Sequence, residues 1–216
     1  MAADVSNQIQ RAQPVWSMEA QVMFNIKGDL KPITKHLTKV QKKQIPFASA
    51  AAINETLKQV VKAEQMQITK RLDRPTPFTV KAFKIRYAKK HALHGEVIIK
   101  PAQWKYLKYQ IEGGTRTGKI GVPTANAKLN KYGNLPGRRK GLIRGKKQYM
   151  NDKGVWERSG GKKNPRSKLV VAFASSVTYT KRFPFYKIAD GVARSQFQKN
   201  FQRSIKRAIA SARWYT

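Results

Sequence analysis

Residues 47–72, with the sequence FASAAAINETLKQVVKAEQMQITKRL, decide the fold. Their apolar positions recur every three or four residues, which is the spacing of one face of an α-helix. The stretch is also rich in alanine, the residue with the highest helix propensity. It therefore predicts a long amphipathic helix that can serve as the spine of a domain. The core-facing positions expected on it are Ala50, Ile53, Leu57, Val60, Val61, Ile68 and Leu72.

Prolines are expected to set both ends of this helix. Pro46 precedes it, and proline is tolerated in the first turn of a helix but not in its interior. Pro75 and Pro77 follow it, and each disfavours helical backbone in the residue before it. A separate, shorter helix that begins after Asp29 is predicted to end near Lys43.

Further elements follow from periodicity. Alternation of apolar and polar residues, or a short apolar run, predicts strands at 17–27, 83–88, 97–99 and 168–177. Helices are predicted at 101–112, which has a proline in its first turn, and at 184–213. The latter has an apolar stripe of Ile188, Val192, Phe197, Phe201, Ile205 and Ile209. Together these elements predict an α+β fold in which long helices pack on a small antiparallel sheet.

The composition changes abruptly in residues 113–168. This stretch holds 11 of the 14 glycines and 16 Lys and Arg residues, against only Asp152 and Glu157. Glycine loses much backbone entropy on ordering, and few apolar groups are present to offset that loss. We therefore expect a long, flexible, basic Gly-rich loop. The predicted organisation is an N-terminal extension at 1–16, a single α+β body at 17–112 and 167–213, and a basic Gly-rich loop insertion at 113–166.

The charge of the chain indicates an anionic partner. The sequence has 45 Lys and Arg against 11 Asp and Glu, a net charge of +34, and such a surface repels itself unless a polyanion neutralises it. Lys and Arg spaced through glycine can follow a phosphate backbone without reading bases. The residues expected to contact nucleic acid or a partner are Arg138, Arg139, Lys140, Arg144, Lys146, Lys147, Lys162, Lys163 and Arg166.

Two other interpretations of the basic segment stay open. Tyr132, Tyr149 and Trp156 lie among the charges and could stack on bases, but they could equally anchor the segment against protein. The charges could also form a solvated run or a protein-docking arm. No recognition-helix, zinc-finger or RNA-binding aromatic motif is present, so any nucleic-acid contact is expected to be independent of sequence.

Signals for catalysis are weak. The chain has no cysteine, and its acidic residues are scattered singly, so no cluster that would hold Mg²⁺ is visible. His91 and His94 fall in a predicted turn with no acidic neighbour before Glu96. Residues 113–119, GGTRTGK, lack the spacing of a phosphate-binding loop, and Ile120 stands where that loop has Ser or Thr. We expect no enzymatic activity, no metal and no cofactor, and no run of apolar residues is long enough to span a bilayer.

The order of elements and two short phrases suggest a family. The phrases are the Ala50-Ala51-Ala52-Ile53-Asn54-Glu55-Thr56-Leu57 start of the long helix and Arg74-Pro75-Thr76-Pro77-Phe78-Thr79. With a Gly/Arg/Lys-rich middle and a closing basic amphipathic helix, the chain resembles the minor tail protein Z family of lambda-like phages. This family belongs with the tail-completion, or neck, proteins of long-tailed bacteriophages. The resemblance extends over residues 24–213.

The resemblance implies a structural virion protein of the tail or neck, made in the host cytoplasm. It implies an α+β subunit that assembles as a hexameric ring around the path of the phage DNA and contacts other tail and connector proteins during tail completion and head-tail joining. The extension at 1–16, with Ile9, Val15 and Trp16, departs from the family pattern and could dock on a partner. The alternative, based on charge alone, is a non-sequence-specific nucleic-acid-binding protein of the ribosomal or nucleoid type.

Overall fold

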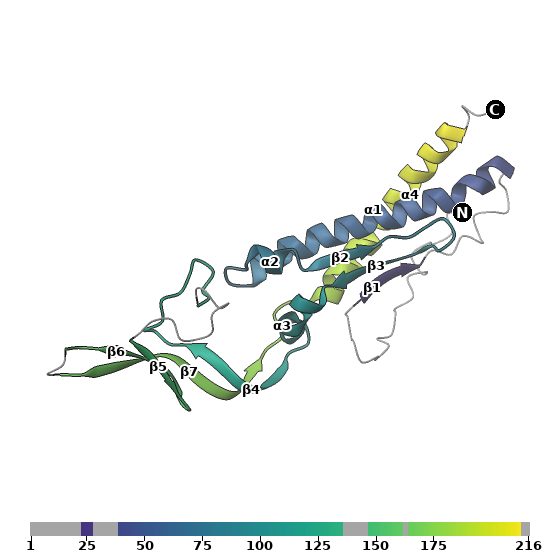
Figure 1. Ribbon diagram of the computed structural model, residues 1–216. Coiled ribbons are helices and arrows are strands. Elements are labelled where there is room, and N and C mark those ends of the chain that lie inside the picture. Colours follow the sequence, from purple (N-terminus) through teal and green to yellow (C-terminus); the bar gives the residue numbers. More distant parts are fainter. Residues whose placement is uncertain (1–22, 28–38, 136–146, 162–163, 213–216) are drawn as a thin grey trace. The chain divides into compact units, whose positions relative to one another are not determined.

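The computed structural model of this 216-residue chain describes residues 23–27, 39–135, 147–161 and 164–212 (Figure 1). The chain divides into two compact units. Unit 1 comprises Met1–Arg71, Pro77–Leu107 and Phe183–Thr216, and unit 2 comprises Leu72–Thr76 and Lys108–Arg182. Each unit contains an antiparallel sheet, and long helices accompany the sheet of unit 1, which confirms the predicted α+β class.

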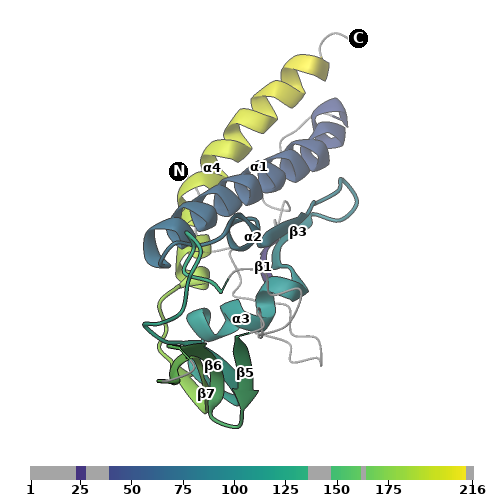
Figure 2. The same ribbon diagram turned by 60° about the vertical axis from the view of Figure 1, so that its left-hand side comes forward.

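Unit 1 combines two long helices with a three-stranded sheet. Helices α1 (Lys39–Arg71) and α4 (Phe185–Ala212) lie side by side and run in opposite directions (Figure 2). The strand order is β1-β3-β2, and both pairings are antiparallel. These strands are β1 (Met23–Lys27), β2 (Phe83–Arg86) and β3 (His94–Ile99), and a one-turn helix α2 (Pro77–Val80) precedes β2.

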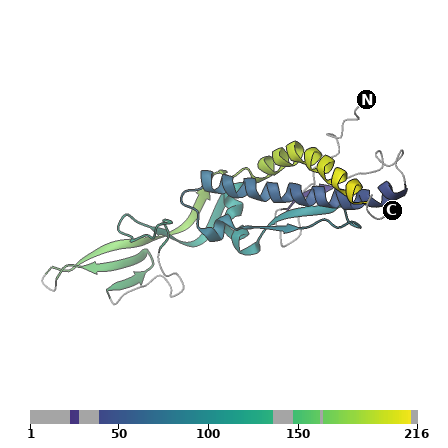
Figure 3. The ribbon, with the colours of Figure 1, turned by 90° about the horizontal axis from the view of Figure 1, so that it is seen from above.

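Helix α1 packs against α4 on one side and against β3 on another (Figure 3). Towards α4, the amide of Asn200 donates to the hydroxyl of Thr56 and to the side-chain oxygen of Gln59, each at 3.0 Å. Towards the sheet, Gly95 lets the helix come close, because a Cβ there would lie 2.6 Å from Leu57 Cδ1 and 3.0 Å from Ile53 Cγ2. The predicted spine is thus confirmed, and two of its faces are buried.

An aromatic cluster closes the core of unit 1. The rings of Phe83, Phe183 and Phe185 have centroids 6.0–6.5 Å apart, and all three side chains are buried. Pairs at this separation contribute beyond their buried area. The cluster joins the start of β2 to the start of α4, which are about 100 residues apart in the chain.

The prediction that Pro46 begins the long helix is wrong. Helix α1 starts at Lys39 and continues through Pro46. An interior proline removes one backbone hydrogen bond, at a cost of about 3 kcal/mol. Ile45 and Ala48 are buried on either side of it, and this burial offsets the loss. The predicted end near Lys43 is therefore absent, and residues 28–38 of the predicted shorter helix lie outside the described residues.

The remaining predicted elements of unit 1 are confirmed. The hairpin of β2 and β3 and the final helix occur where alternation and helical spacing placed them. Of the first predicted strand, residues 23–27 form β1 and residues 17–22 lie outside the described part of the chain. On α4, Phe185, Ala189 and Ala193 are the fully buried apolar residues, whereas the predicted stripe is half-buried.

Unit 2 is built on a four-stranded antiparallel sheet of order β4-β7-β6-β5. Helix α3 (Pro101–Ile111) leads from unit 1 into this unit. A small core of Val155, Val170 and Val171 holds the sheet, with Ala127, Leu135 and Phe173 packed against it. The strands are β4 (Gly114–Pro123), β5 (Gln148–Asn151), β6 (Gly154–Ser159) and β7 (Arg166–Tyr179).

The predicted flexible loop at 113–166 is wrong for the described residues, and with it the single-body organisation. Three of the four strands of unit 2 lie in this stretch. Several of the described glycines serve turns or close contacts: Gly113, Gly133 and Gly160 have positive φ angles of 73–91°. A Cβ on Gly154 would overlap the carbonyl oxygen of Val171. Glycine is the residue that fits such positions.

Candidate nucleic-acid interface

Only two of the nine predicted contact residues lie among the described residues. Lys147 immediately precedes β5, and Arg166 is the first residue of β7. Both are exposed. The other seven lie outside the described residues: Arg138, Arg139, Lys140, Arg144, Lys146, Lys162 and Lys163.

The sheet brings Lys147 and Arg166 to the same end of three neighbouring strands. Arg158 of β6 donates its backbone N–H to the carbonyl of Lys147 at 2.9 Å, and the next residue, Ser159, is the register partner of Arg166. Because neighbouring residues of a strand point to opposite faces, Lys147 and Arg166 belong to opposite faces of the sheet. These two predicted contacts therefore lie on opposite faces at this end of the sheet.

Four further basic residues of the sheet were not singled out by sequence reasoning. Arg116 and Lys119 lie on β4, Arg158 on β6 and Lys168 on β7, and all four are exposed. A clear local signal exists only for Arg116, because Thr115 and Thr117 on either side of it favour strands. None of these four forms a salt bridge with an acidic residue of the described chain.

Unit 2 is strongly positive as a whole. Its described residues comprise 13 Lys and Arg against Asp73, Glu112, Asp152 and Glu157, a balance of +9. The one salt bridge among these residues joins Arg74 to Asp73 at 3.2 Å. Charges without counter-charges at short range produce a positive potential over the surface, which attracts a polyanion at a distance.

Aromatic side chains accompany the charges on one face of β5, β6 and β7. Tyr149, Trp156 and Leu169 are register partners across the three strands, so they share that face. The guanidinium of Arg158 lies 5.3 Å from the ring centroid of Tyr149, whose hydroxyl is 3.2 Å from the hydroxyl of Ser167. The face thus holds one cation over an aromatic ring beside a second aromatic side chain, a combination that can contact bases as well as phosphates.

A turn that is capped by the side chain of Asn151 holds this face in place. The side-chain oxygen of Asn151 accepts from the backbone N–H groups of Lys153 and Gly154 at 3.1 and 3.0 Å. It also accepts from Nε1 of Trp156 at 3.1 Å, which orients the indole. Asn and Gly are the residues that favour such turns. The Trp156 ring is therefore held in place before any ligand arrives.

The segments weighed as enzymatic signals have structural roles. Residues 114–119 of the Gly-Lys segment form the start of β4 and not a loop that leads into a helix. Nε2 of His94 lies 2.7 Å from Oε1 of Glu96, whose second oxygen accepts from Arg86 at 3.2 Å, and these contacts join β2 to β3. Among the described residues, no group of three or more His, Asp and Glu could hold a metal ion.

None of the described helices is long and apolar enough to cross a bilayer. The chain matches no family model, no curated protein and no solved structure.

Proposed function

We propose that the protein is a structural virion protein of a phage tail or neck. In this role it forms an oligomeric ring around the DNA path, takes part in tail completion and head-tail joining, and contacts neighbouring tail and connector proteins. The proposal rests on the resemblance of residues 24–213 to the minor tail protein Z family and on one structural observation. That observation is the exposed basic sheet of unit 2, whose Lys and Arg side chains largely lack counter-charges among the described residues.

The sheet suits contact with passing DNA for a physical reason. Exposed Lys and Arg attract phosphates whatever the base sequence, and their attraction weakens steeply with salt. A ring that DNA must traverse needs this kind of affinity, because base-specific contacts would hold the DNA at particular sequences. Charges on both faces and at the end of the sheet supply it without a recognition element.

On this proposal the gene for the chain belongs to a phage genome, and a direct test of the role deletes it there. Deletion of the gene is expected to leave heads and tails unjoined or tails incomplete, as seen by electron microscopy of the lysate. Supply of the protein from a plasmid should restore complete particles. Normal, infectious particles after the deletion would contradict the proposed role.

The DNA interface has its own test with purified protein. The substitutions Arg116→Glu, Arg158→Glu and Lys168→Glu together should reduce the slope of log K against log salt for duplex DNA by about 3, since each phosphate contact contributes about 0.9. Lys62→Glu, Lys70→Glu and Lys84→Glu, all exposed in unit 1, make the same charge change outside the sheet. Equal losses in the two triple variants would show that only net charge matters and would contradict an interface on the sheet.

The second candidate is a ribosomal or nucleoid nucleic-acid-binding protein. The face with Tyr149, Trp156 and Arg158 favours it, because aromatic rings beside a cation are suited to single-stranded nucleic acid. It predicts that the protein sediments with ribosomes or nucleoids and prefers single strands over duplex. The virion role predicts its presence in purified particles.

A further inference from the structure

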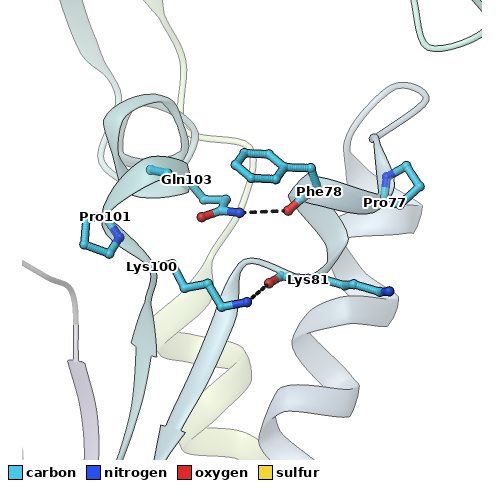
Figure 4. A pocket seen from close by; sticks show the side chains of 7 residues that line it. Pro77, Phe78, Lys81, Lys100, Pro101 and Gln103 are labelled. Atoms are coloured by element: carbon cyan, nitrogen blue, oxygen red, sulfur yellow. Dashed lines mark hydrogen bonds between the residues drawn. The ribbon is translucent and has the colours of Figure 1, made fainter.

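Unit 1 contains a shallow hollow that is not part of the DNA interface proposed on unit 2. It lies between the one-turn helix α2 and the first turn of α3, and its volume is about 550 Å³ (Figure 4). We call it the α2–α3 hollow. Its lining residues are Pro77, Phe78, Lys81, Lys100, Pro101, Ala102 and Gln103.

Hydrogen bonds hold its walls in place. The buried amide of Gln103 donates to the carbonyl of Phe78 at 3.1 Å, and Nζ of Lys100 donates to the carbonyl of Lys81 at 2.8 Å (Figure 4). The hydroxyls of Thr79 and Tyr106 are 3.0 Å apart and join α2 to α3 a second time. A ligand would therefore meet a preformed site, and little of its binding free energy would be spent on ordering it.

The surface inside the hollow is mainly apolar. Phe78 is 57% exposed, although it is one of the largest apolar side chains of the unit, and Pro77, Pro101 and Ala102 extend the apolar surface. Recognition sites commonly combine such a concave apolar surface with a few fixed polar groups. The shape and chemistry suit one aromatic or large aliphatic side chain.

The charges around the hollow are all of one sign. Lys81 and Lys100 are its charged lining residues, and no acidic residue of the described chain lines it. Lys100 uses one ammonium proton for the carbonyl of Lys81, which leaves two for a ligand. Helix α3 begins here without an acidic residue in its first turn, so its dipole adds to the positive potential. Charge complementarity therefore requires a carboxylate beside the apolar group of the ligand.

We propose that the α2–α3 hollow is a docking site for an acidic segment of a partner protein, which inserts one aromatic or large aliphatic side chain and places carboxylates on Lys81 and Lys100. A nucleic-acid backbone would satisfy the lysines but would leave Phe78 without an apolar partner. All lining residues belong to unit 1, so the proposal is independent of the DNA interface on unit 2.

The test uses the full chain and a fluorescein-labelled probe peptide, Gly-Ser-Glu-Glu-Phe-Asp-Glu-Gly-Ser, at about 150 mM salt, where weak long-range attraction is screened. Binding is followed by fluorescence anisotropy, and amide shifts in an NMR spectrum locate the site. Phe78→Ser should weaken binding about tenfold, since it removes one buried aromatic contact. Lys81→Glu should weaken it by a similar or larger factor.

Matched controls separate docking from general attraction to a basic protein. Lys84→Glu makes the same charge change at an exposed residue outside the hollow, and Tyr87→Ser removes an aromatic ring that is 54% exposed. Both should leave the affinity within about twofold. A peptide with Ser in place of Phe should bind about tenfold more weakly to the unchanged protein.

Three results would overturn the proposal. One is equal binding of the two peptides, and another is equal loss in Lys81→Glu and Lys84→Glu. The third is that a duplex DNA oligonucleotide, and not the peptide, shifts the amides of Phe78, Lys81 and Ala102, which would make the hollow part of a nucleic-acid surface. Loss of the DNA interface on unit 2 would leave the expected peptide results unchanged.

Discussion

At the scale of single residues, Glu64 departs most from ordinary behaviour. Its side chain is fully buried on α1, one turn from Val60 on one side and from Ile68 on the other, both of which are also fully buried. Neither carboxyl oxygen has a hydrogen-bond partner among the described residues. Burial raises the pKa of Glu64 from 4.5 to about 9, because a charged carboxylate is poorly solvated there. Glu64 is therefore protonated at neutral pH.

The raised pKa makes stability depend on pH. Between about pH 4.5 and 9 the unfolded chain releases the Glu64 proton while the folded chain keeps it, so the free energy of unfolding falls as pH rises, by about 1.4 kcal/mol per unit. Glu64→Met should remove this dependence and stabilise the protein at pH 8 by a few kcal/mol, with little gain at pH 5. Urea unfolding followed by circular dichroism at both pH values measures the difference. A gain of equal size at both would show that Glu64 does not titrate as described.

At the scale of elements, the tight pairing of β6 with β7 depends on Gly154. A Cβ at this position would overlap the carbonyl oxygen of Val171 and lie 2.8 Å from Leu169 Cδ1. Gly154→Ala should therefore push the strands apart and destabilise the sheet by roughly 1–3 kcal/mol. The rate of tryptic cleavage after Lys153 and Arg158 should rise about tenfold, because local opening becomes more frequent.

Gly161 offers a matched control for this substitution. It also lies in unit 2, no atom of the described residues outside its chain neighbours lies within 4 Å of the position of its Cβ, and its φ is not positive. Gly161→Ala should leave the cleavage rate nearly unchanged. If both alanine variants were cleaved equally fast, close packing at Gly154 would not be the cause.

The helices and the sheet of unit 1 could be predicted from the sequence because their signals are local. The spacing of Ile53, Leu57 and Val60 specifies the buried face of α1, and alternation specifies the hairpin of β2 and β3. The start of α1 was predicted wrongly at Pro46 because the burial of Ile45 and Ala48 outweighs the local backbone preference of proline. This burial depends on tertiary contacts, which the local sequence does not reveal.

In unit 2 the strand predicted at 168–177 is confirmed as part of β7, but β4, β5 and β6 were missed because composition outweighed pattern. The glycine and lysine content of this stretch indicates disorder. However, the turn residues Asn151-Asp152-Lys153-Gly154 between Tyr149 and Trp156 are a hairpin signal that can be recognised in the sequence. The pairing of β4 with β7 could not be foreseen, since it joins residues about 50–65 apart. The sheet positions of Arg116, Arg158 and Lys168 also depend on this register, so the sequence alone could not place them together.

At the scale of the whole molecule, the two units differ in the size of the hydrophobic core that offsets the repulsion between their charges. Most of the fully buried apolar side chains belong to unit 1, whereas a small valine cluster holds the sheet of unit 2, whose described residues have a balance of +9. Self-repulsion destabilises a compact charged unit, and a small core offers little to offset it. Unit 2 should therefore be the less stable part of the chain, and an anionic partner should stabilise it by mass action.

Hydrogen exchange of the full chain tests this difference. Amides of β5 and β6 should exchange faster than those of β3 and α1, because local opening costs less where few apolar contacts are lost. A rise in salt from about 50 to 200 mM should slow exchange in β5 and β6, since it shortens the range of the repulsion, and should affect β3 little. DNA affinity should fall over the same range. Salt would thus stabilise the sheet while it weakens DNA binding. If hydrogen exchange in β5 and β6 did not respond to salt, charge repulsion would not limit the stability of the sheet.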